Sequence, residues 1–201
     1  MKFQRNTVIL ATTALFLGGL VYLLEVRPTA QQEEAKTQQQ QIFSFKEQQV
    51  RSFQITTQDQ TLKFVKKSDP PASPKPNSQP ASSWTMEQPK SGAANDATIA
   101  YLLSLLASGQ ATSQVSVPTN RLDEFGLVKP TATITVTLDN QQTHRLVLGK
   151  ANFNRSALYA QADPKEGAGE QNILSVSTAF EDAINRPVAE WQKGQEANST
   201  P

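Results

Sequence analysis

The chain lacks cysteine, and this absence excludes several kinds of bond and site. The chain has 201 residues and no cysteine. It therefore has no disulfide bond, no cysteine nucleophile and no metal site with cysteine ligands. Small secreted scaffolds usually depend on disulfides, so we expect a domain that packing alone holds together.

Histidine is almost as scarce, since His144 is the only one. A metal site needs several ligands at known spacing, so we predict no metal and no cofactor. Ser-His-Asp catalysis would have to use His144, and the sequence has no Gly-x-Ser-x-Gly motif. His144 alternates with Leu146 and Leu148 along a predicted strand, which favours a structural role.

Motifs for phosphate and dinucleotide binding are also missing. Asp123 and Glu124 are adjacent acids, and we interpret them as solvated charges because a general acid–base pair needs facing positions in a cleft. The net charge is +1 and the basic residues are scattered, which argues against nucleic-acid binding. We predict no enzyme and no catalytic, cofactor or metal residues, although a Ser–Lys pair stays open because its partners need not be neighbours in sequence.

One long apolar run is present, at residues 7–24, with 18 residues and no charge. As a helix it would span about 27 Å, close to the ~30 Å core of a bilayer. Lys2 and Arg5 precede it, so we place residues 1–6 in the cytoplasm and the residues after Leu24 outside. A cleaved signal peptide is the alternative, but its apolar region is usually shorter.

We therefore predict a single-pass membrane protein of the bacterial inner membrane, with an internal photosynthetic membrane as the alternative location. A Gln-rich stalk, residues 25–41, is expected to precede an extracytoplasmic domain at 42–191. Within that domain, the Pro-rich segment 68–83 is predicted to be a disordered insert. Residues 192–201 are predicted to be a disordered tail.

Alternating apolar residues predict most of the strands. Segments 50–57 and 62–65 indicate one hairpin. The strict alternation of 131–138, followed by 144–148, indicates a second hairpin, which we expect at the centre of the sheet. Further extended segments are expected at the following positions: 84–86, 114–117, 158–160 and 173–176.

The clearest helix is predicted at 95–108, with Asn95 as N-cap and Gly109 as a C-terminal glycine cap. A short helix near the C-terminus is expected to begin with a capping box of Thr178 and Glu181. Together these patterns predict an α+β fold. An N-terminal transmembrane helix would precede an antiparallel β-sheet domain, built from hairpins and packed by two helices.

The order of these segments resembles that of domain-of-unknown-function family 4340 of bacteria. The matching features are Phe125-Gly126-Leu127, Pro130, the Thr-rich strand 131–138 and the closing segment Leu146–Gly149. The resemblance covers nearly all of 42–191. It implies an anchored envelope domain, which in some members accompanies ABC-type transporters of gliding motility, and it implies no catalytic residues. The Pro-rich insert departs from the short connection usual in the family.

Three classes of function follow from these observations. The leading hypothesis is a non-enzymatic module that binds a membrane or envelope protein at an exposed hairpin edge. The second is an accessory subunit of an ABC-type transport system, which rests on the family context alone. The third is a small-molecule- or glycan-binding domain, or a hydrolase, with a pocket lined by Trp84, Tyr101 or Trp191.

Overall fold

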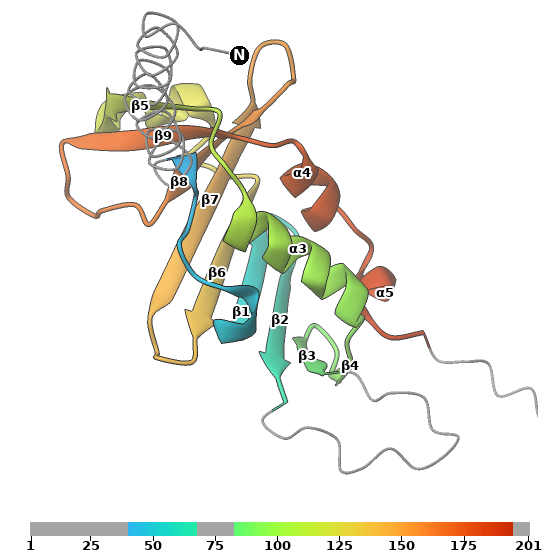
Figure 1. The fold of residues 1–201 in the computed structure, drawn as a ribbon. Helices are drawn as coiled ribbons and strands as arrows, with labels where there is room; N and C mark the ends of the chain where they lie inside the picture. The colour runs from blue at the N-terminus through green and yellow to red at the C-terminus, as the bar shows by residue number, and fades with distance from the viewer. Residues whose placement is uncertain (1–39, 68–82, 195–201) are drawn as a thin grey trace, which may run out of the picture. The chain divides into compact units, whose positions relative to one another are not determined.

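A computed structural model describes residues 40–67 and 83–194 (Figure 1). From Gln41 onward the described residues form one compact unit. Several predicted segments lie outside the described residues: 1–6, 7–24, nearly all of 25–41, almost the whole Pro-rich insert, and residues 195–201 of the tail.

Within the described residues, nine strands form a single antiparallel sheet in the order β4-β3-β2-β1-β6-β7-β8-β9-β5. Their bounds are β1 Val50–Thr57, β2 Thr61–Lys66, β3 Trp84–Gln88, β4 Gly92–Ala93, β5 Ser113–Pro118, β6 Ala132–Leu138, β7 Thr143–Ala151, β8 Leu158–Ala162 and β9 Glu170–Val176. The helices are α3 Asp96–Ser108, α4 Ala179–Ile184 and α5 Val188–Trp191, with 3₁₀ turns η2 Glu47–Gln49 and η3 Thr119–Phe125.

The hairpin of β6 and β7 occupies the middle of the sheet, as the alternation predicted. In β6 the residues alternate between buried and half-buried along the whole strand. Ile134 lies between Ile55 of β1 and Leu146 of β7, and all three are fully buried. Because side chains point alternately to the two faces, one face of β6 is apolar and the other carries threonines.

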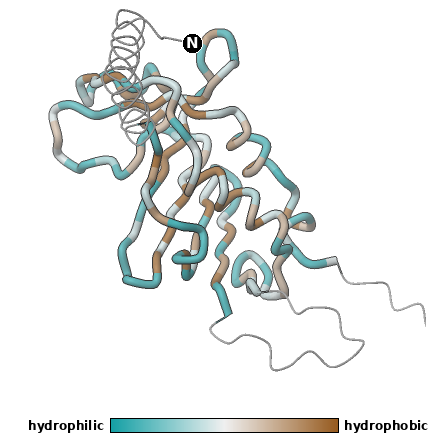
Figure 2. Tube along the Cα trace, in the orientation of Figure 1, coloured by the Kyte–Doolittle hydropathy of each residue, from teal (hydrophilic) through white to brown (hydrophobic). Residues whose placement is uncertain are grey.

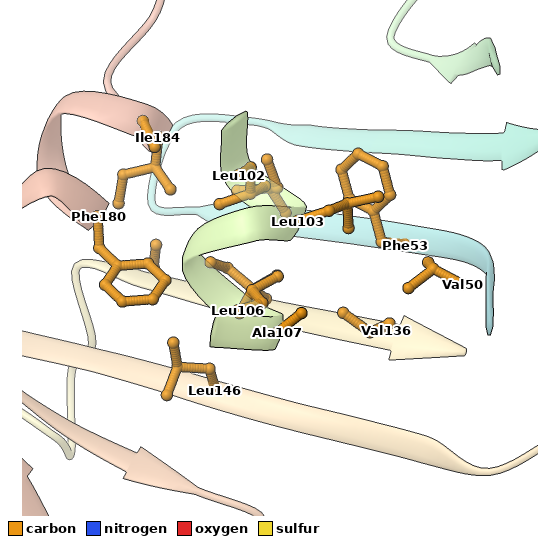
Figure 3. Close-up of a cluster of buried hydrophobic side chains, with 14 of the residues drawn as sticks. Val50, Phe53, Leu102, Leu103, Leu106, Ala107, Val136, Leu146, Phe180 and Ile184 are labelled. Carbon is orange, nitrogen blue, oxygen red and sulfur yellow. The ribbon is translucent and has the colours of Figure 1, made fainter. Parts of the chain in front are cut away.

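The main core lies between the apolar face of the sheet and the helices. Figure 3 shows Leu102, Leu103 and Leu106 of α3 directed toward side chains of β1, β6 and β7, with Phe180 and Ile184 of α4 beside them. In Figure 2 the hydrophobic residues gather where the strands meet α3, and the turns are hydrophilic. Helix α3 is therefore the principal cover of this face.

A second, smaller apolar cluster lies on the opposite face at the β5 end of the sheet. Val117, Val147 and Ile173 come from three strands and pack with Leu127. Phe125 of η3 meets Tyr159 of β8 edge to face, with ring centroids 5.0 Å apart. Gly149 allows this approach, because a Cβ there would clash with the carbonyl oxygen of Phe125.

The fold class predicted from the sequence is wrong. The described residues form one large antiparallel sheet with few helices, not an α+β domain of hairpins packed by two helices, and the predicted transmembrane segment lies outside these residues. Among residues 40–67 and 83–194, no helix is long and apolar enough to cross a bilayer. The physical reason is that every hairpin adds to one continuous sheet, whereas Pro187 interrupts the C-terminal helical segment and leaves only six residues in α4 and four in α5.

Local signals at the helix ends had mixed outcomes. The N-cap is confirmed, because Asn95 Oδ1 accepts hydrogen bonds from the N–H groups of Ala97 and Thr98. Gly109 is extended rather than left-handed, and it is needed because a Cβ would clash with the Leu105 carbonyl. The capping box is wrong, because the Thr178 side chain makes no capping bond.

Candidate functional site

The face of the sheet opposite α3 is polar over β1 and β6. Thr133, Thr135 and Thr137 of β6 are half-buried on this face. Their neighbours across the pairing on β1 are Thr56, Gln54 and Ser52. No described helix covers this part of the sheet, so hydroxyl and amide groups form the accessible surface beside the second apolar cluster.

A groove of about 390 Å³ lies where this polar face meets the second cluster. Thr133, Arg145, Val147 and Gln161 share the open face, because their positions pair across β6, β7 and β8. The groove is lined by Thr119, Leu122, Leu127, Pro130, Thr133, Arg145, Val147, Gln161, Pro164, Lys165, Glu166, Gly167 and Gln171. The connection from β8 to β9 forms one wall, and η3 with the residues after it forms the other.

Arg145 and Gln161 are among the polar side chains that the strands themselves place in the groove, whereas Lys165 and Glu166 belong to the connection from β8 to β9. Arg145 is half-buried, and its guanidinium makes no hydrogen bond or ion pair with any residue of the part of the chain described. Gln161 is only 4% exposed and donates from Nε2 to Gln171 Oε1 at 3.3 Å. A partly buried cation without a partner favours an incoming anion, because the anion restores the interactions that burial removed.

His144 lies on the apolar side of the same strand, where its ring packs against Phe43 and Phe45 with centroid distances of 5.2 and 5.5 Å. Its Nδ1 is 2.8 Å from Asp163 Oδ2. Asp163 Oδ1 accepts the N–H of Arg145, and this aspartate has a left-handed φ of 45°. No serine or threonine hydroxyl of residues 40–67 and 83–194 is hydrogen-bonded to His144, so the ring has the surroundings of a packed side chain.

The adjacent acids Asp123 and Glu124 lie on η3. Glu124 forms an exposed ion pair with Arg121, with Nη2 and Oε2 2.7 Å apart. The hydrogen bond from Arg121 holds the pKa of Glu124 below its ordinary value, and the same bond raises the pKa of Arg121. A carboxylate stabilised in its charged form at the surface is poorly suited to proton transfer near neutral pH.

The aromatic residues proposed for a ligand pocket are not brought together. Trp84 packs edge to face on Phe53, and Trp191 packs on Phe64, so both belong to the main core. Tyr101 is 40% exposed, under the guanidinium of Arg186. None of the three lines the groove.

The two edges of the sheet differ. At one edge, β4 has only two residues, and the segment after α5 covers it: Gln192 bridges Ala94, and the N–H of Lys193 donates to the carbonyl of Ala93. At the other edge, β5 has six residues and no charged side chain. Within the described residues no strand pairs with its outer side.

Hydrogen bonding along β5 determines which groups face outward. The N–H of Thr119 donates to Gly169, and the register continues as Val117 with Gln171 and Val115 with Ile173. Bonded and non-bonded pairs alternate in an antiparallel ladder, so the N–H groups of Gln114 and Ser116 point away from β9. Pro118 fits the same alternation, because proline has no N–H and is tolerated at an edge.

Sequence reasoning located β5 and its closing proline, but it missed Arg145 and Gln161. Alternation along β7 and β8 was enough to place both on the open face. Arg145 and Gln161 line a groove only because η3 and residues 164–167 pack beside them and form its walls. No pattern in the sequence predicts where that cover packs.

Comparison with known proteins gives one positive finding. The family model described as "Domain of unknown function (DUF4340)" matches residues 84–199. The match begins at β3, and it includes the groove and the whole of β5. Neither a search of curated proteins nor a search of solved structures produced a match.

Proposed function

We propose a role in protein interaction for this chain, which belongs to the DUF4340 family of domains of unknown function. The domain acts without catalysis and accepts an extended segment of a partner protein along β5. The observation that carries this proposal is the open, uncharged edge of β5 at one end of a nine-stranded sheet.

Natural sheets usually protect long edges with charges, bulges, prolines or covering segments. The opposite edge is short and covered, whereas Ser113–Ser116 leave their side chains exposed, with Val115 50% exposed. An extended peptide would pair with the outward N–H groups of Gln114 and Ser116, and exposed side chains such as Val115 would contribute selectivity. The groove adjoins this strand through Thr119 and Gln171, so a bound segment could extend toward it.

The location we propose for this interaction is the extracytoplasmic side of a membrane. The support is in the sequence: the uncharged run at 7–24 has the length of a membrane span, and Lys2 and Arg5 precede it. A domain attached there meets partners at high local concentration, so a weak strand pairing suffices. We therefore expect the partner to be another membrane or envelope protein.

The test removes one outward N–H of β5. Ser116→Pro deletes that donor, and Ser116→Ala is the matched control because it keeps the donor and loses only the hydroxyl bond to Glu170. The full chain is crosslinked in native membranes and purified in detergent, and its partners are identified by mass spectrometry.

We expect wild type and Ser116→Ala to recover the same stoichiometric partner and Ser116→Pro to lose at least ten-fold of it. Circular dichroism must show all three proteins folded. Equal recovery by Ser116→Pro, or recovery of the bare wild-type protein, would contradict strand addition at β5.

A further inference from the structure

The turn between β7 and β8 presents a fully exposed aromatic side chain. Phe153 has a relative exposure of 105%, the highest among the large apolar residues described. The turn that carries it is ordered by its own hydrogen bonds. Asn152 Oδ1 accepts from the N–H groups of Ser156 and Ala157, and Asn154 Oδ1 accepts from the Ser156 hydroxyl. A turn with internal hydrogen bonds therefore presents the phenyl ring to solvent.

Basic residues flank Phe153 in the sequence. Lys150 and Arg155 lie in the segment 150–157, which contains no acid. The connection before β6 runs alongside, because the N–H of Thr131 donates to Leu148 and its hydroxyl to Gly149. That connection adds exposed Lys129 and Val128, the latter 60% exposed. Apolar and cationic side chains thus share one end of the sheet with Glu124 of η3, whose pKa is lowered first by its hydrogen bond to Arg121 and also by the charge of Lys150.

The compact unit begins at this same end. Gln41 bridges Gln110, and two residues later the N–H of Thr112 donates to Ser175 at the end of β9. The neighbouring Val176 pairs with Leu158, which directly follows the turn. Figure 1 shows the β7–β8 turn projecting from the end of the sheet opposite the end from which the chain leaves β2. Gln41 is therefore linked through Gln110 and Thr112 to the end of β9 beside this turn, and the chain then runs along the sheet, where Phe43 and Phe45 pack on His144.

We propose that this end of the domain rests on an anionic bilayer surface, with Phe153 entering the headgroup region. Phenylalanine, like tryptophan and leucine, can be buried at the boundary of headgroups and acyl chains, and lysine and arginine are attracted to anionic lipid headgroups. The inference rests on the proposed attachment through residues 7–24, because one ring and a few charges give only weak, reversible binding unless the chain is already held at the surface. Sixteen residues separate that run from Gln41. This is enough chain to let the end of the domain that carries Gln41 reach the lipid.

The experiment uses the full chain reconstituted in vesicles of phosphatidylcholine and phosphatidylglycerol, some of it brominated on the acyl chains. Phe153→Trp reports lipid contact by quenching of its fluorescence, against the background of buried Trp84 and Trp191 in wild type. Asn140→Trp is the matched control, because Asn140 is exposed in the β6–β7 turn at the opposite end of the sheet.

We expect the brominated lipid to quench the added tryptophan of Phe153→Trp by at least half, and that of Asn140→Trp hardly at all. Adding Lys150→Glu and Arg155→Glu should reduce the quenching at least two-fold. Equal, weak quenching of both added tryptophans would overturn the proposal. Flotation on a density gradient distinguishes the contact of Phe153 with lipid from the attachment through residues 7–24. If the Phe153→Trp chain floats while its added tryptophan stays unquenched, only the surface contact is disproved, whereas a chain that does not float disproves the attachment itself.

Discussion

The chemical role that Arg145 can have depends on the residues packed around it. In the sequence it is one of 19 basic residues and nothing distinguishes it. In the structure it is half-buried in the groove beside Gln161, with no partner among the described residues. The position of His144 on a strand face with Leu146 and Leu148, by contrast, was readable from alternation alone.

The unpaired guanidinium predicts that the groove binds small anions. In calorimetric titrations with citrate and with a glutamate dipeptide, wild type should bind at least one of them in the millimolar range or better. Arg145→Gln should weaken that binding at least ten-fold, because the amide keeps the polarity and loses the charge.

Arg51→Gln is the matched control, since Arg51 is exposed on β1 and is not part of the groove. An unchanged affinity in Arg145→Gln, or no binding of either anion, would show that the groove does not select anions.

Among the elements, α3 contributes most to the core. It supplies four fully or nearly fully buried large side chains: Ile99, Leu102, Leu103 and Leu106. Its first turn is joined to α5, because Asn95 Nδ2 and the Thr98 hydroxyl both donate to the carbonyl of Glu190. Asn95 thus caps the N-terminus of α3 and also helps to join α3 to α5. The cap itself was predictable from the sequence, but its contact with α5 was not.

Replacing the cap should destabilise the domain. Asn95→Ala removes the acceptor for two N–H groups and the donor to Glu190, so we expect a loss of about 1–2 kcal/mol in the free energy of unfolding. Asn95→Asp keeps the acceptor, loses the donor and adds a negative charge that the helix N-terminus favours, so its cost should be clearly smaller.

Urea denaturation followed by circular dichroism measures both variants. Equal losses for the two would indicate that the bond to Glu190, rather than the helix cap, carries the stabilisation.

The folded domain extends beyond the residues that the family model matches. Residues 84–199 match the family, but β1 and β2 precede them and are not peripheral. Strand β1 lies between β2 and β6, and it contributes Phe53 and Ile55, which are 2% and 0% exposed. Phe64 of β2 stacks on Phe53, with ring centroids 4.7 Å apart, and also contacts Trp191. The first hairpin therefore belongs to the same core.

This arrangement predicts that a fragment of residues 84–201 does not fold alone. Without β1 and β2, the central strand β6 becomes an open edge, and the apolar surface beneath α3 loses its partners. The fragment should lack a cooperative thermal transition in circular dichroism, whereas residues 41–201 should show one. A cooperative transition in the short fragment would mean that the first hairpin is dispensable to the core.

The sequence by itself determined the local elements: the alternating strands, the central hairpin, the capped helix and the lack of cysteine chemistry. These depend on periods of two and 3.6 residues and on capping side chains, which neighbours in the chain specify. Only the tertiary structure decided that all the hairpins join one nine-stranded sheet, that η3 covers its second face, and that β4 is closed while β5 is open. Those outcomes depend on contacts between residues far apart in the chain, such as Gly149 with Phe125 and Ala94 with Gln192, and no local pattern encodes them.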